Sequence, residues 1–145
     1  EPAWGGSNWL SGFYEGLICE LVEWAEHQFK LNRPDQNGTT EREHLEQVER
    51  QTGRRIGALE PPTPFPMLIS HVWSAFIALS SSRGSGFSGP APITFEQIKA
   101  WKELTETSIE PWEIEAIKRI NLEYLRVANG WRYQISNRGW WPGLN

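Results

Sequence analysis

The stretch from Met67 to Ser81 constrains the fold most, because the helix that it predicts is apolar on nearly all sides. Such a helix needs other elements around it, which places it at the centre of a folded domain. The longest apolar run, Phe65 to Leu79, is interrupted by Pro66, Ser70, His71 and Ser74, so it is too short and too polar to span a bilayer. The apolar residues of the predicted helix are Leu68, Ile69, Val72, Trp73, Phe76, Ile77 and Leu79.

Two further helices are predicted before this stretch. One runs from about Trp9 to Lys30 and has apolar residues at steps of three and four. The other begins at Thr40, which has capping-box spacing to Glu43, and ends at Gly53. This second helix is mostly charged, so it needs another element to dock on. The apolar stripe of the first helix consists of Leu10, Phe13, Leu17, Leu21 and Trp24.

Two helices are predicted after it. The first begins with a second capping box, Thr94 with Gln97, and the other begins at Pro111, whose missing N–H costs nothing in a first turn. Asn129-Gly130 ends the last helix. We expect Phe95, Ile98, Trp101 and Leu104 to face the core from one helix, and Ile114, Ile117, Ile120, Tyr124 and Val127 from the other. The outer pairs expected on the last helix are Glu115 with Arg119 and Arg119 with Glu123.

These patterns predict an all-α fold, a small bundle of about five helices with linkers rich in Pro and Gly. We expect residues 1–60 to form an N-terminal arm of two helices and a linker, residues 61–130 the helical core module, and residues 131–145 an aromatic tail. Trp140 and Trp141 in the tail have no evident core role. A docking peptide and a disordered end both remain open for it.

Charge and cysteine content exclude several classes of protein. The formal net charge of −4 gives no excess of positive charge to attract a phosphate backbone, so we expect no nucleic-acid partner. Cys19 is the only cysteine, which rules out an intramolecular disulfide. No signal peptide is evident at the start, and we expect a cytoplasmic protein without a membrane partner.

No group of residues has the spacing of a reaction centre or a metal site. His27, His44 and His71 fall on three predicted elements without a ligand partner at local spacing, and His71 is expected to be a hydrogen-bonded core or interface histidine. Cys19 is interpreted as a small buried thiol. We therefore predict no catalytic residue, no metal and no cofactor, and a protein that is not an enzyme.

The loop from Ser82 to Ile93 is the most suggestive candidate for contact with a partner. Its glycines and Arg83 precede a helix, but it lacks a Gly-Lys-Ser/Thr ending and no strand comes before it, so phosphate binding is disfavoured. A flexible connection and a partner-binding loop both remain open, and Phe87 among the glycines favours the second. The predicted partner-binding residues are Trp73, Phe76, Arg83, Phe87 and Trp101, with core packing as the alternative for Trp73, Phe76 and Trp101.

A series of spaced motifs runs through residues 44–128. They are His71-Val72-Trp73-x-x-Phe76-x-x-Leu79-Ser80, Arg83-x-Ser85-Gly86-Phe87-x-Gly89-Pro90-x-Pro92-Ile93-Thr94-Phe95, Ile98-x-x-Trp101-x-x-Leu104, and Pro111-Trp112-Glu113 with Ile117, Tyr124 and Leu125. With these motifs the stretch resembles small tail assembly proteins of long-tailed bacteriophages, described as tail assembly chaperones or the downstream half of such a chaperone. The upstream piece His44-Leu45-x-x-Val48-x-x-Gln51-Thr52-Gly53 resembles the segment before this module.

The resemblance implies a chaperone that acts in the cytoplasm of the bacterial host and is absent from the finished particle. Its partners would be the tape-measure protein, which it keeps soluble, and the tail-tube protein, which it helps to recruit. In many such phages the downstream half arises by a ribosomal frameshift and has no start codon. A chain that begins with Glu1 fits this, and a trimmed chain fits it equally.

Two other functions remain open at this point. The chain could be a structural or interaction subunit that stays in the particle, or a helix-turn-helix regulator built on the last two helices. The second is disfavoured because Glu103, Glu106, Glu110, Glu113 and Glu115 would face phosphate. Self-association into a homo-oligomer is also open.

Overall fold

The computed structural model describes residues 4–86 and 89–129, with side chains from residue 12 onward. The predicted all-α fold is confirmed, since five α-helices account for most of this part of the chain. They are α1 (Trp4–Leu31), α2 (Glu41–Thr52), α3 (Ser70–Ser81), α4 (Phe95–Thr105) and α5 (Pro111–Asn129), with 3₁₀ turns η1 (Gly57–Leu59) and η2 (Met67–Ile69).

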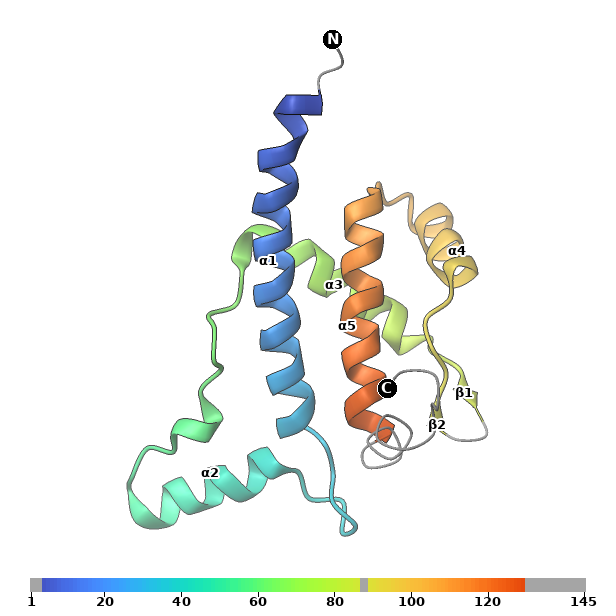
Figure 1. The fold of residues 1–145 in the computed structure, drawn as a ribbon. Helices are drawn as coiled ribbons and strands as arrows, with labels where there is room; N and C mark the ends of the chain where they lie inside the picture. Colours follow the sequence, from blue (N-terminus) through green and yellow to red (C-terminus); the bar gives the residue numbers. More distant parts are fainter. Residues whose placement is uncertain (1–3, 87–88, 130–145) are drawn as a thin grey trace, which may run out of the picture.

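The helices are arranged around a central pair, α1 and α5, which lie side by side (Figure 1). Helix α3 crosses behind both of them, and α4 lies on the far side of α5 from α1. Helix α2 sits beyond the C-terminal end of α1, and the chain after it runs back along α1 to reach η2. The N-terminal turns of α1 extend past the start of α5.

One hydrophobic core joins α1, α3, α4 and α5. Phe76, Leu21, Ile117 and Ile120 are among its fully buried side chains. Because Ile18, Leu21 and Ala25 of α1 belong to this core, it draws on residues from both sides of residue 60. The division into arm, module and tail stays a prediction, and residues 131–145 lie outside the described part. The buried members are Ile18, Leu21, Ala25, Ile69, Val72, Ala75, Phe76, Leu79, Ile93, Ile98, Ala116, Ile117 and Ile120.

The helix ends follow the capping signals closely. The Thr40 hydroxyl accepts from the Glu43 N–H while the Glu43 carboxylate accepts from the Thr40 N–H, and Thr94 and Gln97 repeat this arrangement. Gly53 ends α2 in the left-handed region at φ 66°, where glycine has no Cβ to clash. Helix α1 begins earlier than predicted, at Trp4, and α3 begins with the 3₁₀ turn η2.

The loop after α3 contains a small antiparallel sheet that the sequence did not predict. Strand β1 (Ser85–Gly86) pairs with β2 (Gly89–Pro90), so that Ser85 lies opposite Pro90. Strand β2 contacts α5. Gly89 has φ 131°, and a Cβ there would lie 3.2 Å from Oδ1 of Asn129, so glycine fits both the backbone and the close approach.

Three predictions about side chains are wrong. Phe95 and Leu104 do not face the core; they are 65% and 84% exposed, because only Ile98 and Trp101 of α4 are turned toward the other helices. Arg119 pairs with Glu15 of α1 instead of its own-helix neighbours, and Glu123 pairs with Arg126. Cys19 is exposed and not buried, and its Sγ lies 3.6 Å from the Arg119 guanidinium of α5.

Within residues 4–86 and 89–129, no helix is both long enough and apolar enough to cross a bilayer.

Candidate protein-binding surface

Four ring side chains form a continuous series of contacts where α1, α3 and α5 meet. Phe13 meets Tyr14 edge to face at 5.7 Å, Tyr14 stacks on Trp112 at 4.4 Å, and Trp112 meets His71 edge to face at 5.8 Å between ring centroids. We call Phe13, Tyr14, Trp112 and His71 the aromatic ladder. These rings pack against one another outside the core, since none of the four residues is buried.

Hydrogen bonds fix the ladder at its α5 end. Nε2 of His71 lies 2.6 Å from Oε1 of Glu113, while Oε2 of Glu113 accepts from the backbone N–H of Glu110 at 2.6 Å. The indole N–H of Trp112 donates to the Glu110 carboxylate at 2.7 Å. The buried Glu113 carboxylate therefore holds α3 and the first turn of α5 together, and His71 is a hydrogen-bonded interface residue as predicted.

Two strongly exposed apolar residues precede His71 of the ladder by about one helical turn. They are Met67 and Leu68 of η2, each 73% exposed. Together with the ladder we call them the ladder surface, six residues from three helices and a 3₁₀ turn. Exposed apolar area is typical of a surface that other proteins cover. The sequence alone does not predict this surface, because Met67 and Leu68 fall in the helix that is expected to be buried. The preceding run Pro61-Pro62-Thr63-Pro64-Phe65-Pro66 was the one signal that the start of this helix is exposed.

Two of the predicted partner-binding residues belong to an aromatic cluster between α1 and α3. Trp73 meets Trp24 at 5.1 Å and stacks on Phe76 at 5.4 Å between ring centroids. Phe29 contacts both of them, and also Tyr124 of α5. Phe76 is 1% exposed, so its packing is that of the core, whereas Trp73 is half-buried.

Arg83 ties three segments together. Its guanidinium donates to Oδ1 of Asn121 at 2.6 Å and to the Ala91 carbonyl at 3.0 Å, and it stands 4.3 Å from the centre of the Tyr124 ring. Burial lowers the pKa of Arg83, while Tyr124 opposes that shift. These contacts give Arg83 a structural role, because they attach the end of α3 and the stretch after β2 to α5.

Trp101 and Phe87 are the other two predicted partner-binding residues. Trp101 is half-buried and packs against the core from α4. Phe87 lies outside the described residues. The structure therefore does not bring the five together into one exposed patch within its described part.

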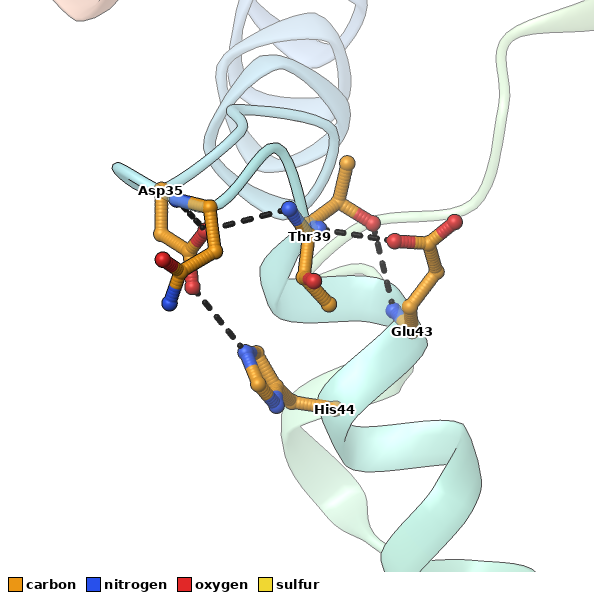
Figure 2. Close-up of polar contacts among 6 residues, drawn as sticks. Asp35, Thr39, Glu43 and His44 are labelled. Carbon is orange, nitrogen blue, oxygen red and sulfur yellow. Dashed lines mark hydrogen bonds and ion pairs between the residues drawn. The ribbon is translucent and has the colours of Figure 1, made fainter.

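A polar cluster organises the turn between α1 and α2 (Figure 2). Oδ1 of Asp35 accepts from the backbone N–H groups of Asn37 and Thr39, at 2.7 and 3.0 Å, and Oδ2 lies 3.3 Å from Nε2 of His44. The hydrogen bond from His44 is the main cause of a lowered pKa of Asp35, followed by the Asn37 N–H. Because the Asp35 carboxylate binds the backbone of its own turn and His44 of α2, the cluster fixes where α2 begins.

This cluster borders an open hollow of about 1320 Å³ between the end of α1, the turn and the end of α5. Its walls carry both charges, with Glu26 and Glu41 facing Lys30 and Arg33. Lys30 is paired with Glu26 at 2.6 Å. The described residues contain no group of three or more His, Cys, Asp or Glu side chains placed to hold a metal ion.

Comparison with known proteins identifies the family. No curated protein and no solved structure matches the chain. Residues 48–126 match a family described as phage tail assembly chaperone, a stretch that runs from α2 almost to the end of α5 and covers more than half of the chain. This stretch includes Met67, Leu68, His71 and Trp112 of the ladder surface. The chain therefore belongs to the phage tail assembly chaperone family.

Proposed function

We propose that this protein acts by non-enzymatic binding, in the host cytoplasm, to the tape-measure protein, the tail-tube protein or both while the tail is built. The observation that carries the proposal is the ladder surface, in which Met67 and Leu68 are largely exposed on a member of a chaperone family. A chaperone needs apolar area that a partner can cover, and it needs no reaction centre.

The composition of the ladder surface supports this role. Trp and Tyr side chains supply large contact areas at a low cost in conformational entropy, and Met adapts its shape to an irregular partner. The hydrogen bonds of Trp112 and Glu113 hold the rings in place before any partner arrives. Partner contact by Trp73, Arg83, Phe87 or Trp101 remains a proposal, secondary to the ladder surface.

Co-expression with the tape-measure candidate from the same genome tests the function. We expect the two proteins to co-purify and the soluble fraction of the tape-measure protein to rise severalfold. If the chain neither co-purifies with that protein nor raises its solubility, and the same holds for the tail-tube protein, the proposal is wrong. Mass spectrometry of purified virions should not detect the chain, whereas a retained structural subunit would appear there.

Variants of the ladder surface test the site. The double variant Met67→Ser/Leu68→Ser should reduce the co-purified partner at least tenfold, since both side chains are exposed and the core is untouched. Phe95→Ser is the matched control, because Phe95 is similarly exposed but belongs to α4, which carries no residue of the ladder surface. Equal losses in both variants would show that the binding is not localised at the ladder surface. Unchanged thermal unfolding confirms that each variant is folded.

A further inference from the structure

Helix α1 lies in an apolar groove whose walls are α3 and α5. Its apolar ridge, Ile18, Leu21 and Ala25, repeats at steps of three and four residues and is between 0% and 3% exposed. The ridge shares one core with Phe76 of α3 and Ile117 of α5. The opposite face of α1 is polar and exposed, with Glu20 and Glu23. An amphipathic helix seated in a groove through i, i+3 and i+7 anchors is a recurring mode of peptide recognition.

The family comparison separates the groove from the helix that fills it. The matching stretch, residues 48–126, contains α3, α4 and nearly all of α5, and thus both walls of the groove. Helix α1, which ends at Leu31, lies wholly outside it. The groove therefore belongs to the part shared with the family, whereas the helix seated in it does not.

The polar contacts that hold α1 against α5 and against the chain after α2 are open to water. Arg119 donates to Glu15 at 2.7 Å, with side chains 33% and 55% exposed. Nε2 of His27 is 2.9 Å from the Ala58 carbonyl, and the Thr63 hydroxyl donates to the Glu20 carbonyl at 3.3 Å. Exposed contacts of this kind add little to stability. Hydrophobic contact is the main attachment of α1, and another helix with the same apolar spacing can supply it.

The connection from α1 to the groove also permits exchange. Helix α2 has no buried residue. After it, residues 53–66 run as an extended chain with one short turn, η1. At its end this connection is anchored, since Phe65 packs against Trp24 of α1 and Pro66 is buried, so α1 leaves the groove only if another helix takes over its apolar contacts.

We propose that the groove between α3 and α5 is a docking site for an amphipathic helix of a partner protein, and that α1 is a resident helix which the partner helix replaces. The partner helix carries aliphatic side chains at the spacing of Ile18, Leu21 and Ala25, and a carboxylate one turn earlier that reaches Arg119. This deepens the proposed function, because a tail protein would supply the helix. Phe13 and Tyr14 would leave the ladder surface with α1, whereas Met67, Leu68, His71 and Trp112 would stay with the groove.

A labelled peptide with the sequence of residues 12–31 tests the groove directly in the full chain. Its binding is followed by fluorescence anisotropy. The full chain with Leu21→Ala has a weakened resident helix, so it should bind the peptide at least about tenfold more tightly than the unmodified chain does. A peptide carrying Leu21→Asp should not bind. Equal affinity of both chains, or equal binding of both peptides, would overturn the proposal.

Locking the resident helix gives a second test that does not depend on the stability of the Leu21→Ala variant. Sγ of Cys19 lies 3.6 Å from the Arg119 guanidinium, so a short thiol crosslinker can join Cys19 to a cysteine introduced by Arg119→Cys. The crosslinked chain should lose peptide binding at least tenfold relative to the same variant without crosslinker. Undiminished binding to the locked chain would contradict the proposal. If the crosslink forms between two chains and not within one chain, the helix in the groove comes from a second copy of this protein, and the proposal of a partner protein's helix is wrong.

Neither test contains a tail protein. If the peptide does not bind, the docking site between α3 and α5 is contradicted and the proposed function is not affected. If the co-expression test fails, the proposed function is contradicted and the peptide result is not affected.

Discussion

Helices α1 and α2 are both part of the predicted N-terminal arm, yet they are held in opposite ways. Helix α1 places three residues in the core, and its contact with α5 is the most extensive between any two described elements. Helix α2 has no buried residue, and Val48 is 43% exposed. The first is held by hydrophobic burial and the second by hydrogen bonds of its side chains.

The polar contacts of α2 are specific. Arg42 donates to Gln28 and Asn32 at the end of α1, at 2.7 and 2.9 Å, and Glu49 accepts from the Ile56 N–H at 2.6 Å. Such contacts fix the direction of a helix but contribute only about 0.5–1.5 kcal/mol each. We conclude that α2 can open locally while α1 cannot leave without a replacement for its apolar contacts.

Truncation of the α1 ridge should have the largest effect. Leu21→Ala removes a fully buried side chain and leaves a cavity, so we expect the free energy of unfolding to fall by about 2–5 kcal/mol. Urea unfolding followed by circular dichroism measures it. Val48→Ala in α2 is the matched control and should change that energy by less than about 0.5 kcal/mol. Similar losses in the two variants would remove the contrast between the helices.

A variant of Arg83 tests whether polar contacts contribute more to the free energy of unfolding when they are shielded from water. Arg83→Met leaves the buried Asn121 side chain without its donor, so the free energy of unfolding should fall by about 1–3 kcal/mol. Arg55→Met is the control, because Arg55 forms an exposed pair with Glu60 and should contribute less than about 1 kcal/mol. A larger loss from Arg55→Met would contradict this ranking.

The caps of α2 should affect that helix alone. Thr40→Ala removes the side-chain half of the capping box, and Gly53→Ala places a Cβ at φ 66°, so each should destabilise α2 by about 1 kcal/mol. Hydrogen exchange of the α2 amides should accelerate roughly fivefold, with little change in α5. Uniform acceleration in both helices would show that α2 does not open separately.

Acid should weaken the turn before α2, with the smallest effect on the whole molecule. The lowered pKa of Asp35 means that its contribution is complete above the ordinary value of an aspartate and is lost as pH falls through the lowered value. NMR titration of the Asp35 carboxyl measures this. His44→Ala should raise the pKa of Asp35 toward the ordinary value, because His44 is the main cause of the shift. An unchanged pKa in that variant would assign the shift to the backbone N–H groups instead.

Local signals in the sequence predicted the helices well, because capping and periodicity act within a few residues. Both capping boxes and the stop at Gly53 are confirmed. The exposure of Phe95 and Leu104 was not predictable in this way, since the turn of α4 toward the core depends on where α3 and α5 lie. The same reason explains why Arg119 pairs with Glu15, which is far away in the sequence.

The candidate site was harder to predict than the fold. Arg83 stood out among glycines and serines, but its partners Asn121 and Tyr124 come from a helix that begins far downstream. The ladder surface depends on contacts among three helices, so no single stretch of sequence contains it. The family resemblance, in contrast, rested on spacing within residues 44–128 and is confirmed over residues 48–126.

The position of α1 beside α5 has a consequence for the newly made chain. About 90 residues separate the end of α1 from Ile120, and at ~5–20 residues per second the ribosome needs on the order of ten seconds to add them. During that interval the ridge of Ile18, Leu21 and Ala25 has no groove to enter, because one of its walls has not been synthesised. While it is being made, this protein thus carries an uncovered apolar helix of its own, and the time needed to synthesise α5 sets the earliest moment at which the folded protein is available to other chains.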